Sequence, residues 1–522
     1  MVESGTIWQA EVRHGPAATL RDGDEVDVVV VGGGITGVTA ALLIASEGRS
    51  VALLEADRLG CGTTGATSAQ VTAVPDMGFR ALLRRCGVEA GRDYLARCNS
   101  ALELMQSLVD SDRLACSWER VPAYWFSENA AGAGRLENEA DAAEQLGQEC
   151  RLLPEAPLPW PTAGALAVPR QALFHPLRYL QALARVARQR GAQIFESTPV
   201  LAWKEDRDGL VVHTANAQLR AGALVLATHT PLGINPVQTE LTPMQSYMLA
   251  VAVTQPLPAA LFWDTAEPYH YLRPYQEGGR AMVLVGGADH KTGHEAATQE
   301  HFTQLASYAH QRLHSAAIAN WWSAQFYDSA DGLPYIGRSP LTRHVYLATG
   351  FAGVGLVQGT MAAMEVAAEL RGEERDMPWK ATRLTLAAAP RLVSEGLDVA
   401  THWIGDRLKP SERGSVDDLA AGEGRLLRVD GQRRAVYRDD AGRLHVLSPV
   451  CTHLGCLVHW NDTSRTWDCP CHGTRYAATG EVLEGPALSP LAHVETASGP
   501  THDRLPPVAS DRDAQRFDTD KG

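Results

Sequence analysis

The first clear pattern is a pair of apolar runs on either side of a glycine-rich stretch. Residues 27–31 (Asp-Val-Val-Val-Val) are almost wholly apolar, as in a parallel strand that is buried on both faces. The glycine-rich residues 32–37 follow, and residues 38–45 have the composition of a helix. A second apolar run covers residues 50–56. These segments predict a βαβ unit that begins near Val26.

Helical and strand-like patterns alternate through the middle of the chain. Helical periodicity covers residues 93–108 and 177–189, and short apolar runs at 223–227 and 282–285 are typical of strands. The pattern predicts mixed α/β structure without an order of elements.

The pattern changes after about residue 385. Residues 388–404 could form an amphipathic connecting helix, and residues 409–415 have the composition of a linker. Residues 434–447 alternate apolar and polar positions around Asp-Asp-Ala-Gly, which predicts a hairpin. A small all-β module therefore follows a large α/β one. The expected divisions are a main domain at 24–385, a connection at 386–415, a small domain at 416–505 and a disordered tail at 506–522.

Composition and charge narrow the function. The chain has 522 residues, with 47 Lys and Arg against 61 Asp and Glu, a net charge of −14. Nucleic-acid binding has no electrostatic basis, because phosphates are held by basic surface. The longest apolar stretch, 28–45, is broken by three glycines, so no membrane span is expected. The first residues lack a basic and then apolar leader, and we expect a cytoplasmic protein that acts on a small-molecule substrate.

The glycines lie where dinucleotide chemistry needs them. Gly32 permits a tight turn, Gly34 lets the backbone approach a pyrophosphate, and Gly37 allows close packing of helix on strand. The helix N-terminus offers unpaired N–H groups to the phosphates. Glu55 ends the next strand, where it can accept hydrogen bonds from a ribose. The pattern indicates a dinucleotide site but leaves NAD and FAD open.

Two later segments favour a long cofactor. Residues 60–72 are rich in glycine and in threonine and serine, which suits a loop along a phosphate chain and a flavin ring. Asp331–Gly337 precedes residues 345–356, which predict a strand, a glycine turn and a helix start. A returning chain of this kind could supply a second contact to the cofactor.

With these three blocks, residues 1 to about 380 resemble the FAD-dependent superfamily of D-amino-acid oxidase and glycine oxidase. The resemblance implies a Rossmann-like FAD-binding domain with an interleaved substrate subdomain. The superfamily contains amine and amino-acid oxidoreductases, and the resemblance leaves the substrate unnamed. It also implies that FAD contacts the following residues: Gly32, Gly34, Ile35, Thr36, Gly37, Glu55, Thr63, Thr64, Ser68, Ala69, Val200, Asp331, Gly350, Gly353, Gly355 and Leu356.

A cluster of cysteines and histidines marks the small domain. Cys451 and His453 form C-x-H, and Cys469 and His472 form C-x-x-H. Tetrahedral zinc could bind two thiolates and two imidazoles. A Rieske [2Fe–2S] centre fits better, because each half mixes one Cys with one His, as a cluster with one Cys₂ iron and one His₂ iron requires.

Residues 420 to 505 resemble Rieske domains of the cytochrome-bc type. The resemblance implies Cys451, His453, Cys469 and His472 as cluster ligands. It also implies a disulfide between Cys456 and Cys471, and hydrogen bonds to the cluster sulfurs from Thr474 and Tyr476.

Several other residues are weaker candidates for a functional role. His290, His294, Glu295 and His301 could suggest an iron triad, but oxygenases of that kind carry their iron domain after the Rieske domain, so we discount it. His175 before Pro176 is typical of a helix start. In residues 269–273 (Tyr-His-Tyr-Leu-Arg) an arginine beside aromatic rings suits a substrate carboxylate over a flavin, although a strand with amphipathic side chains explains the pattern equally well. His270 and Arg273 are the candidate catalytic residues.

Both halves together resemble bacterial FAD-dependent oxidoreductases with a C-terminal Rieske domain. Flavin accepts two electrons and a [2Fe–2S] cluster carries one, so the chain is expected to be a dehydrogenase that passes electrons from FAD through the cluster to an external one-electron acceptor. Two alternatives remain. One is an NAD(P)H-linked reductase component, for which a second glycine fingerprint would be needed and none is found. The other is a non-enzymatic redox sensor.

Overall fold

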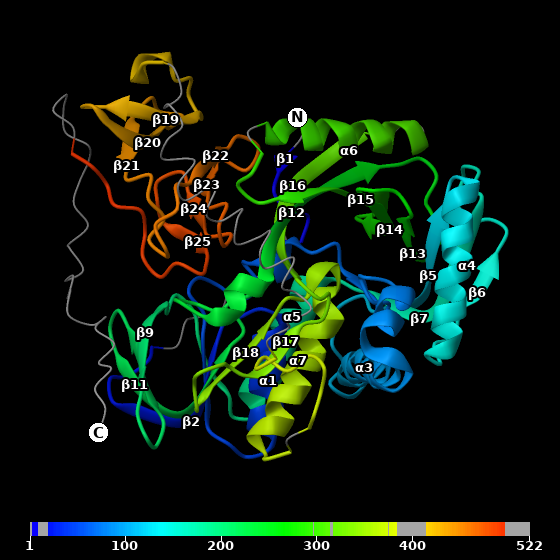
Figure 1. The fold of residues 1–522 in the computed structure, drawn as a ribbon, viewed down its shortest axis with the longest axis horizontal. Coiled ribbons are helices and arrows are strands. Elements are labelled where there is room, and N and C mark those ends of the chain that lie inside the picture. The colour runs from blue at the N-terminus through cyan, green and yellow to red at the C-terminus, as the bar shows by residue number, and fades with distance from the viewer. Residues whose placement is uncertain are drawn as a thin grey trace.

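The apolar runs around the glycine-rich loop become neighbouring parallel strands (Figure 1). The computed structural model describes residues 3–8, 19–295, 297–313, 317–373, 375–383 and 414–495. Strand β2 (Asp24–Val31) lies between β3 (Val51–Leu54) and β11 (Gln218–Leu226), in parallel register with both. The sheet has the order β17-β18-β11-β2-β3-β8, with β10 and β9 continuing from β11. The remaining strands are β8 (Gln193–Phe195), β9 (Val200–Glu205), β10 (Leu210–Thr214), β17 (Tyr335–Arg338) and β18 (Val345–Thr349).

Alternate valines of β2 enter two different cores. Val28 and Val30 pack in the core that contains α1 (Ile35–Ser46), while Val29 and Val31 pack on the opposite face of the sheet. Helix α1 contacts both α5 (Pro176–Gln189) and α7 (Gly355–Leu370). Burial on both faces explains why the run contains hardly any polar residue.

A second, larger sheet lies beside the first and gathers strands from both halves of the main domain. Its order is β1-β16-β12-β15-β14-β13-β5-β7-β4, and β6 pairs with β7. Helices α3, α4 and α6 pack on or beside it. The bounds are β1 (Glu3–Ser4), β4 (Gln70–Val71), β5 (Glu119–Ser127), β6 (Arg151–Leu153), β7 (Gly164–Leu173), β12 (Leu241–Ala252), β13 (Leu261–Asp264), β14 (His270–Glu277), β15 (Arg280–Lys291), β16 (Ala317–Ser329), α3 (Phe79–Ser111), α4 (Ala130–Gln145) and α6 (Thr298–Arg312).

The small domain is built of two antiparallel sheets. One has the order β19-β20-β21 and the other β22-β23-β24-β25. Trp467 and Tyr476 are fully buried in its core together with the cysteines of residues 451–471. The strands are β19 (Gly424–Val429), β20 (Gln432–Arg438), β21 (Leu444–Leu447), β22 (His459–Asn461), β23 (Thr466–Asp468), β24 (Arg475–Ala477) and β25 (Val482–Glu484).

The sequence predictions for the fold are confirmed at the level of element type. The βαβ unit and the hairpin of β20 and β21 form as expected, and mixed α/β structure precedes an all-β domain. Helix α3 begins well before the predicted residue 93, and a kink at Gly87, whose φ is +74°, interrupts it. His175 caps α5 by accepting the N–H of Arg178, as a helix-start residue should. The predicted connecting helix at 388–404, most of the linker at 409–415 and the tail at 506–522 lie outside the described residues.

The small domain packs against β12, β16 and the turn after β15 (Figure 1). The Asn461 amide donates to Gln245 Oε1 at 2.9 Å, and the Ser464 and Ser323 hydroxyls lie 2.8 Å apart. Gly293 brings its backbone against the loop at Pro470, where a Cβ would lie 2.9 Å from the Pro470 nitrogen. Polar side chains and backbone groups therefore hold the two domains together.

No helix in the part of the chain that the structure describes is both long and apolar enough to cross a membrane.

Candidate active site and metal centre

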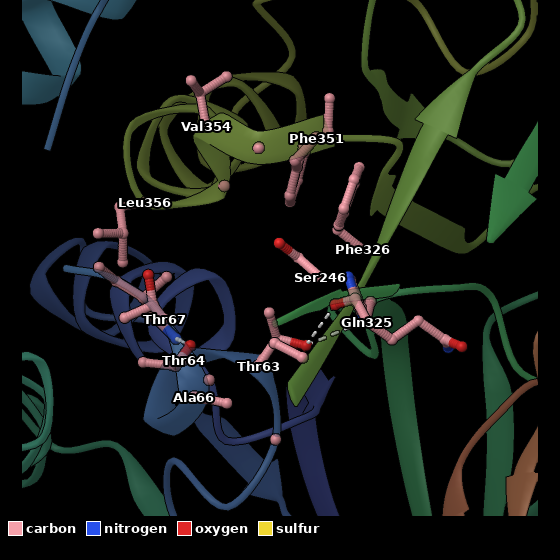
Figure 2. A pocket seen from close by; sticks show the side chains of 18 of the residues that line it. Thr63, Thr64, Ala66, Thr67, Ser246, Gln325, Phe326, Phe351, Val354 and Leu356 are labelled. Carbon is pink, nitrogen blue, oxygen red and sulfur yellow. Dashed lines mark hydrogen bonds between the residues drawn. The ribbon is translucent and has the colours of Figure 1, made fainter. Parts of the chain in front are cut away.

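A cavity of about 1170 Å³ lies between the two large sheets. The glycine-rich loop, the loop around α2 (Thr63–Ala66) and the start of α7 line one part of it. Strands β12, β13 and β16 line another part, and β25 of the small domain closes a third side. Figure 2 shows side chains from the α2 loop, β16 and the start of α7 pointing into the same space.

The glycine-rich loop is shaped so that only glycine fits. Gly32 has a φ of +107°, and a Cβ there would collide with the carbonyl oxygen of Ala227. A Cβ at Gly37 would collide with the carbonyl oxygen of Gly32. Helix α1 starts directly after Gly34, which has no side chain to cap it, so the positive end of the helix faces the cavity. This cradle fits the pyrophosphate of a dinucleotide.

Glu55 lies at the end of β3, beside the glycine loop. Its Oε2 accepts the N–H of Gly33 at 2.5 Å, and its Oε1 accepts the N–H of Asp57 at 2.9 Å. Burial raises the pKa of the Glu55 carboxyl above its usual range. The carboxylate lines the cavity at the position where a ribose would be bound.

The α2 loop is held in place by hydrogen bonds to the start of α1 and to strand β16. Thr64 Oγ1 accepts the N–H of Ile35 at 3.1 Å, and Thr63 Oγ1 donates to the carbonyl of Gln325 at 3.2 Å (Figure 2). Gly65 packs on the carbonyl of Gly60 in the way that Gly37 packs on Gly32. Across the cavity, Phe351, Val354 and Leu356 mark the start of α7.

Most of the residues that the resemblance implied for FAD line this cavity. Gly37 does not line the cavity, because it packs on Gly32. Ala69 does not line it either, because its side chain is fully buried. Gly350 packs on Leu241 and Ser329. Those that line the cavity are Gly32, Gly34, Ile35, Thr36, Glu55, Thr63, Thr64, Ser68, Val200, Gly353, Gly355 and Leu356.

Asp331, which the resemblance also implied for FAD, lies outside the cavity lining. Its carboxylate forms ion pairs with Arg85 and Arg383 at 2.9 Å and accepts the N–H of Leu333. These partners hold the pKa of Asp331 below its usual value. Asp331 is therefore a structural residue that fixes the chain before β17, outside the cavity lining.

The two candidate catalytic residues, His270 and Arg273, lie outside the lining of the large cavity. His270 Nδ1 is 2.9 Å from Asp264 Oδ2, and its ring stacks on Tyr308. Arg273 Nη1 donates to the carbonyl of Ala69 at 2.9 Å and also to carbonyls of Ser68 and Phe174. Both side chains are engaged in contacts with other residues, and their catalytic role stays a prediction.

Residues between and around these two do face the cavity. Tyr269 and Tyr271 line it, together with Trp263, Ser246 and Asp76. The two tyrosines could be anticipated from the aromatic pattern of residues 269–273. Ser246 and Asp76 carry no sequence signal, because a lone serine in a strand and a lone aspartate in a loop are common.

The four predicted cluster ligands converge at the tip of the small domain. Cys451 and Cys469 are buried, and the His453 and His472 rings lie 4.9 Å apart at right angles. Interaction with Cys469 lowers the pKa of Cys451, and the same interaction raises that of Cys469. Two thiols and two imidazoles from separate loops therefore meet in one place, as a [2Fe–2S] centre of the Rieske type requires.

His453 and His472 are both in the uncharged form that a metal ligand requires. Burial lowers the pKa of both His453 and His472 to about 4, so both rings are uncharged at neutral pH. His453 Nε2 donates to the carbonyl of Gly233 at 3.1 Å, while its buried Nδ1 has no hydrogen-bond partner among the described residues. A buried acceptor nitrogen without a partner is what a metal-binding imidazole presents.

The predicted disulfide between Cys456 and Cys471 is present. The sulfurs of Cys456, Cys469 and Cys471 all lie within 4.8 Å of one another, and since two of them are bonded together, Cys469 is left as the ligand. The Tyr476 hydroxyl lies 3.2 Å from Cys451 Sγ, and Thr474 also hydrogen-bonds that thiol. These are the residues that the resemblance placed next to the cluster.

The fold and the two sites define a flavin-dependent oxidoreductase with an attached Rieske domain. Residues 27–369 match the model of the FAD dependent oxidoreductase family, and residues 411–495 match that of the Rieske [2Fe-2S] domain. The chain belongs to the FAD dependent oxidoreductase family, binds FAD and carries a [2Fe–2S] cluster.

Individual relatives agree with both halves. The chain is 32% identical over 499 residues to the putative Rieske 2Fe-2S iron-sulfur protein YhfW of Bacillus subtilis, which covers 94% of this chain and 97% of that protein. The small domain is 37% identical over 78 residues to the cytochrome b6-f complex iron-sulfur subunit of Chlorobaculum thiosulfatiphilum, 15% of this chain and 42% of that protein. The main domain shares the fold of glycine oxidase from Geobacillus kaustophilus, with a TM-score of 0.59 at 20% identity over 69% of this chain and all of the other.

Proposed function

We propose that this protein is a dehydrogenase that oxidises a small amine or amino acid at FAD and passes the electrons through its Rieske cluster to an external one-electron acceptor. When bound, FAD supplies two-electron acceptance and the cluster supplies one-electron transfer. The polypeptide has to bind the substrate, exclude water and keep the two groups close together.

The observation that carries this proposal is that the Rieske domain forms part of the wall of the flavin cavity. Glu484, Gly485 and Leu488 line the same cavity as the glycine-rich loop. The cavity is therefore not separated from the small domain by solvent, and the two cofactor sites share a wall of protein.

Strand β16 bridges the two sites. The Gln325 backbone carbonyl accepts the hydroxyl of Thr63, while its side-chain amide donates to the carbonyl of Gly473 at 2.9 Å. The Tyr327 hydroxyl donates to the carbonyl of His472 at 3.3 Å. A single strand thus contacts the flavin loop and the cluster loop through buried side chains, which favours electron transfer within one chain.

The histidine side of the cluster site also faces the main domain. His453 donates to Gly233, and the Gly233 N–H donates to the carbonyl of Pro486 at 3.0 Å. These contacts support a fixed position for the cluster ligands against the flavin domain.

The experiment is an anaerobic screen of amines and amino acids against the holoprotein. The proposal expects at least one to bleach the flavin absorption, and NADH and NADPH to leave it unchanged. Rapid bleaching by a nicotinamide with none by any amine or amino acid would instead support the reductase alternative, and no bleaching by any donor would support a redox sensor.

Two expectations from the sequence stay predictions. The domain limits at 24–385 and 416–505 with a connection at 386–415 could be tested by limited proteolysis followed by mass spectrometry. The cytoplasmic location could be tested by cell fractionation.

A further inference from the structure

The end of the cavity away from the glycine-rich loop combines a carboxylate with aromatic rings. Asp76 lines it, and its carboxylate accepts the N–H of Gly353 at the entry to α7. The rings of Tyr269, Tyr271 and Trp263 line the same end. Aromatic faces and carboxylates are the two kinds of group that bind organic cations.

A second carboxyl group lies behind this wall. Ser246 lines the cavity (Figure 2). It hydrogen-bonds Asp289 and lies 3.0 Å from the Tyr271 hydroxyl. Asp289 Oδ1 is buried and has no hydrogen-bond partner among the described residues. Burial raises the pKa of Asp76 to about 6, and burial together with the nearby Asp76 raises the pKa of Asp289 to about 7. Neither carboxyl forms an ion pair with a described residue, and His270 acts in the opposite direction by lowering the pKa of Asp289.

Among the described residues that line the cavity, no buried cation is free to pair with a substrate carboxylate. The arginines among them are Arg135 and Arg475. Arg135 is largely exposed and lies 3.8 Å from Glu267, while the buried Arg475 is held by Asp468 and Glu484. Arg273 is committed to backbone carbonyls elsewhere. An amino acid would therefore bring its carboxylate into an acidic cavity without a partner, at a cost in desolvation.

We propose that the cavity selects an organic ammonium that carries no carboxylate beside the nitrogen, held by Asp76 against the aromatic rings with the Asp289 carboxyl as a second negative group. This inference rests on the proposed dehydrogenase function and narrows its substrate from amines or amino acids to amines. It involves binding alone and requires no additional reactant.

The test compares two probes of similar size and opposite charge on the FAD-loaded protein. Benzyltrimethylammonium has no N–H and so cannot form an imine, and benzoate carries the carboxylate instead. Binding is followed by the perturbation of the flavin absorption spectrum and by calorimetry. The inference expects the cation to bind at least about tenfold more tightly, because the carboxylates attract the quaternary ammonium and repel benzoate.

Substitutions locate the site. Asp76→Asn is expected to weaken binding of the cation about tenfold or more while retaining FAD, and Asp289→Asn to weaken it in the same direction. The control is Glu103→Gln, an exposed carboxylate on α3 that pairs with Arg120 outside the cavity, and it is expected to leave the affinity unchanged.

Equal or tighter binding of benzoate, or an unchanged affinity for the cation in Asp76→Asn, would overturn the inference. Neither result would affect the proposed electron transfer from FAD to the cluster. That transfer is measured separately, by following reduction of the cluster after the flavin has been reduced with light. If electrons did not pass from FAD to the cluster, the difference in affinity between benzyltrimethylammonium and benzoate would still be expected.

Discussion

The Tyr327 hydroxyl donates to the backbone carbonyl of His472, 3.3 Å away, and so connects the main sheet directly to a cluster ligand. Tyr327 is fully buried, and its ring packs edge-on against His229 of the flavin cavity. Gln325, two residues earlier, donates to the next carbonyl of the cluster loop, that of Gly473. The contact between these residues fixes how closely the two redox sites approach.

Tyr327→Phe should slow reduction of the cluster without slowing reduction of the flavin. The change removes two buried hydrogen bonds, one to the His472 carbonyl and one from the Gln325 amide, each worth about 1 kcal/mol, and loosens the cluster loop while keeping the ring. Freeze-quench EPR after photoreduction of FAD should show cluster reduction several-fold slower than in the wild type. Tyr124→Phe, which alters a ring stacked on Phe262, is the control. Equal rates of cluster reduction in the wild type and in both variants would exclude a role for the Tyr327 contact.

Cys451→Ser should abolish the iron–sulfur spectrum while FAD stays bound. The ligands lie in loops of the small domain, and the glycine cradle is formed by β2, α1 and β3. Iron analysis and flavin absorption of the same sample measure both cofactors. Loss of flavin from a variant that is still folded would show that the two sites are not separable.

Cys456→Ser or Cys471→Ser should leave all four ligands in place but give a labile cluster. A disulfide that closes a loop of about 15 residues contributes roughly 3 kcal/mol, and here it joins the two ligand loops. The rate of bleaching of the cluster on warming should rise several-fold. Cys150→Ser, which removes a half-buried free cysteine of the main domain, should not change it. A cluster that is equally stable without the disulfide would contradict this role.

The sequence predicted most of what is fixed by local rules. The steric demands of Gly32 and Gly37 and the mixed Cys and His spacing are determined by chemistry that depends on residue type, whereas the Cys456–Cys471 disulfide was expected from the resemblance to Rieske domains. His270 and Arg273 were predicted to face the substrate but lie outside the cavity lining, because the pattern of a strand does not show which groups a side chain will reach. Gln325, Tyr327 and Asp76 were missed, since their roles arise only when segments that are distant in sequence pack together.

Binding of benzyltrimethylammonium should strengthen as pH rises from about 5 to about 8. The pKa of Asp76 lies at about 6 and that of Asp289 at about 7, so both carboxyls are neutral at the acidic end and charged at the basic end. Tyr269 and Tyr271 stay protonated throughout, because burial raises their pKa values. His270, the nearby histidine, is paired with Asp264. Calorimetry across this pH range should give an increase of about tenfold in the association constant of the cation. An association constant that stays constant or falls as the pH rises would contradict the proposed role of the carboxylates.

The most direct test of the electron relay is anaerobic photoreduction of the holoprotein with simultaneous measurement of flavin absorption and the Rieske EPR signal. Rieske potentials span about −150 to +300 mV, and each 59 mV of one-electron driving force is a factor of about ten in the equilibrium. The account predicts that electrons placed on the flavin appear on the cluster of the same chain, with close to one reduced cluster per chain before the flavin is fully reduced. An oxidised cluster that persists beside fully reduced FAD would contradict it.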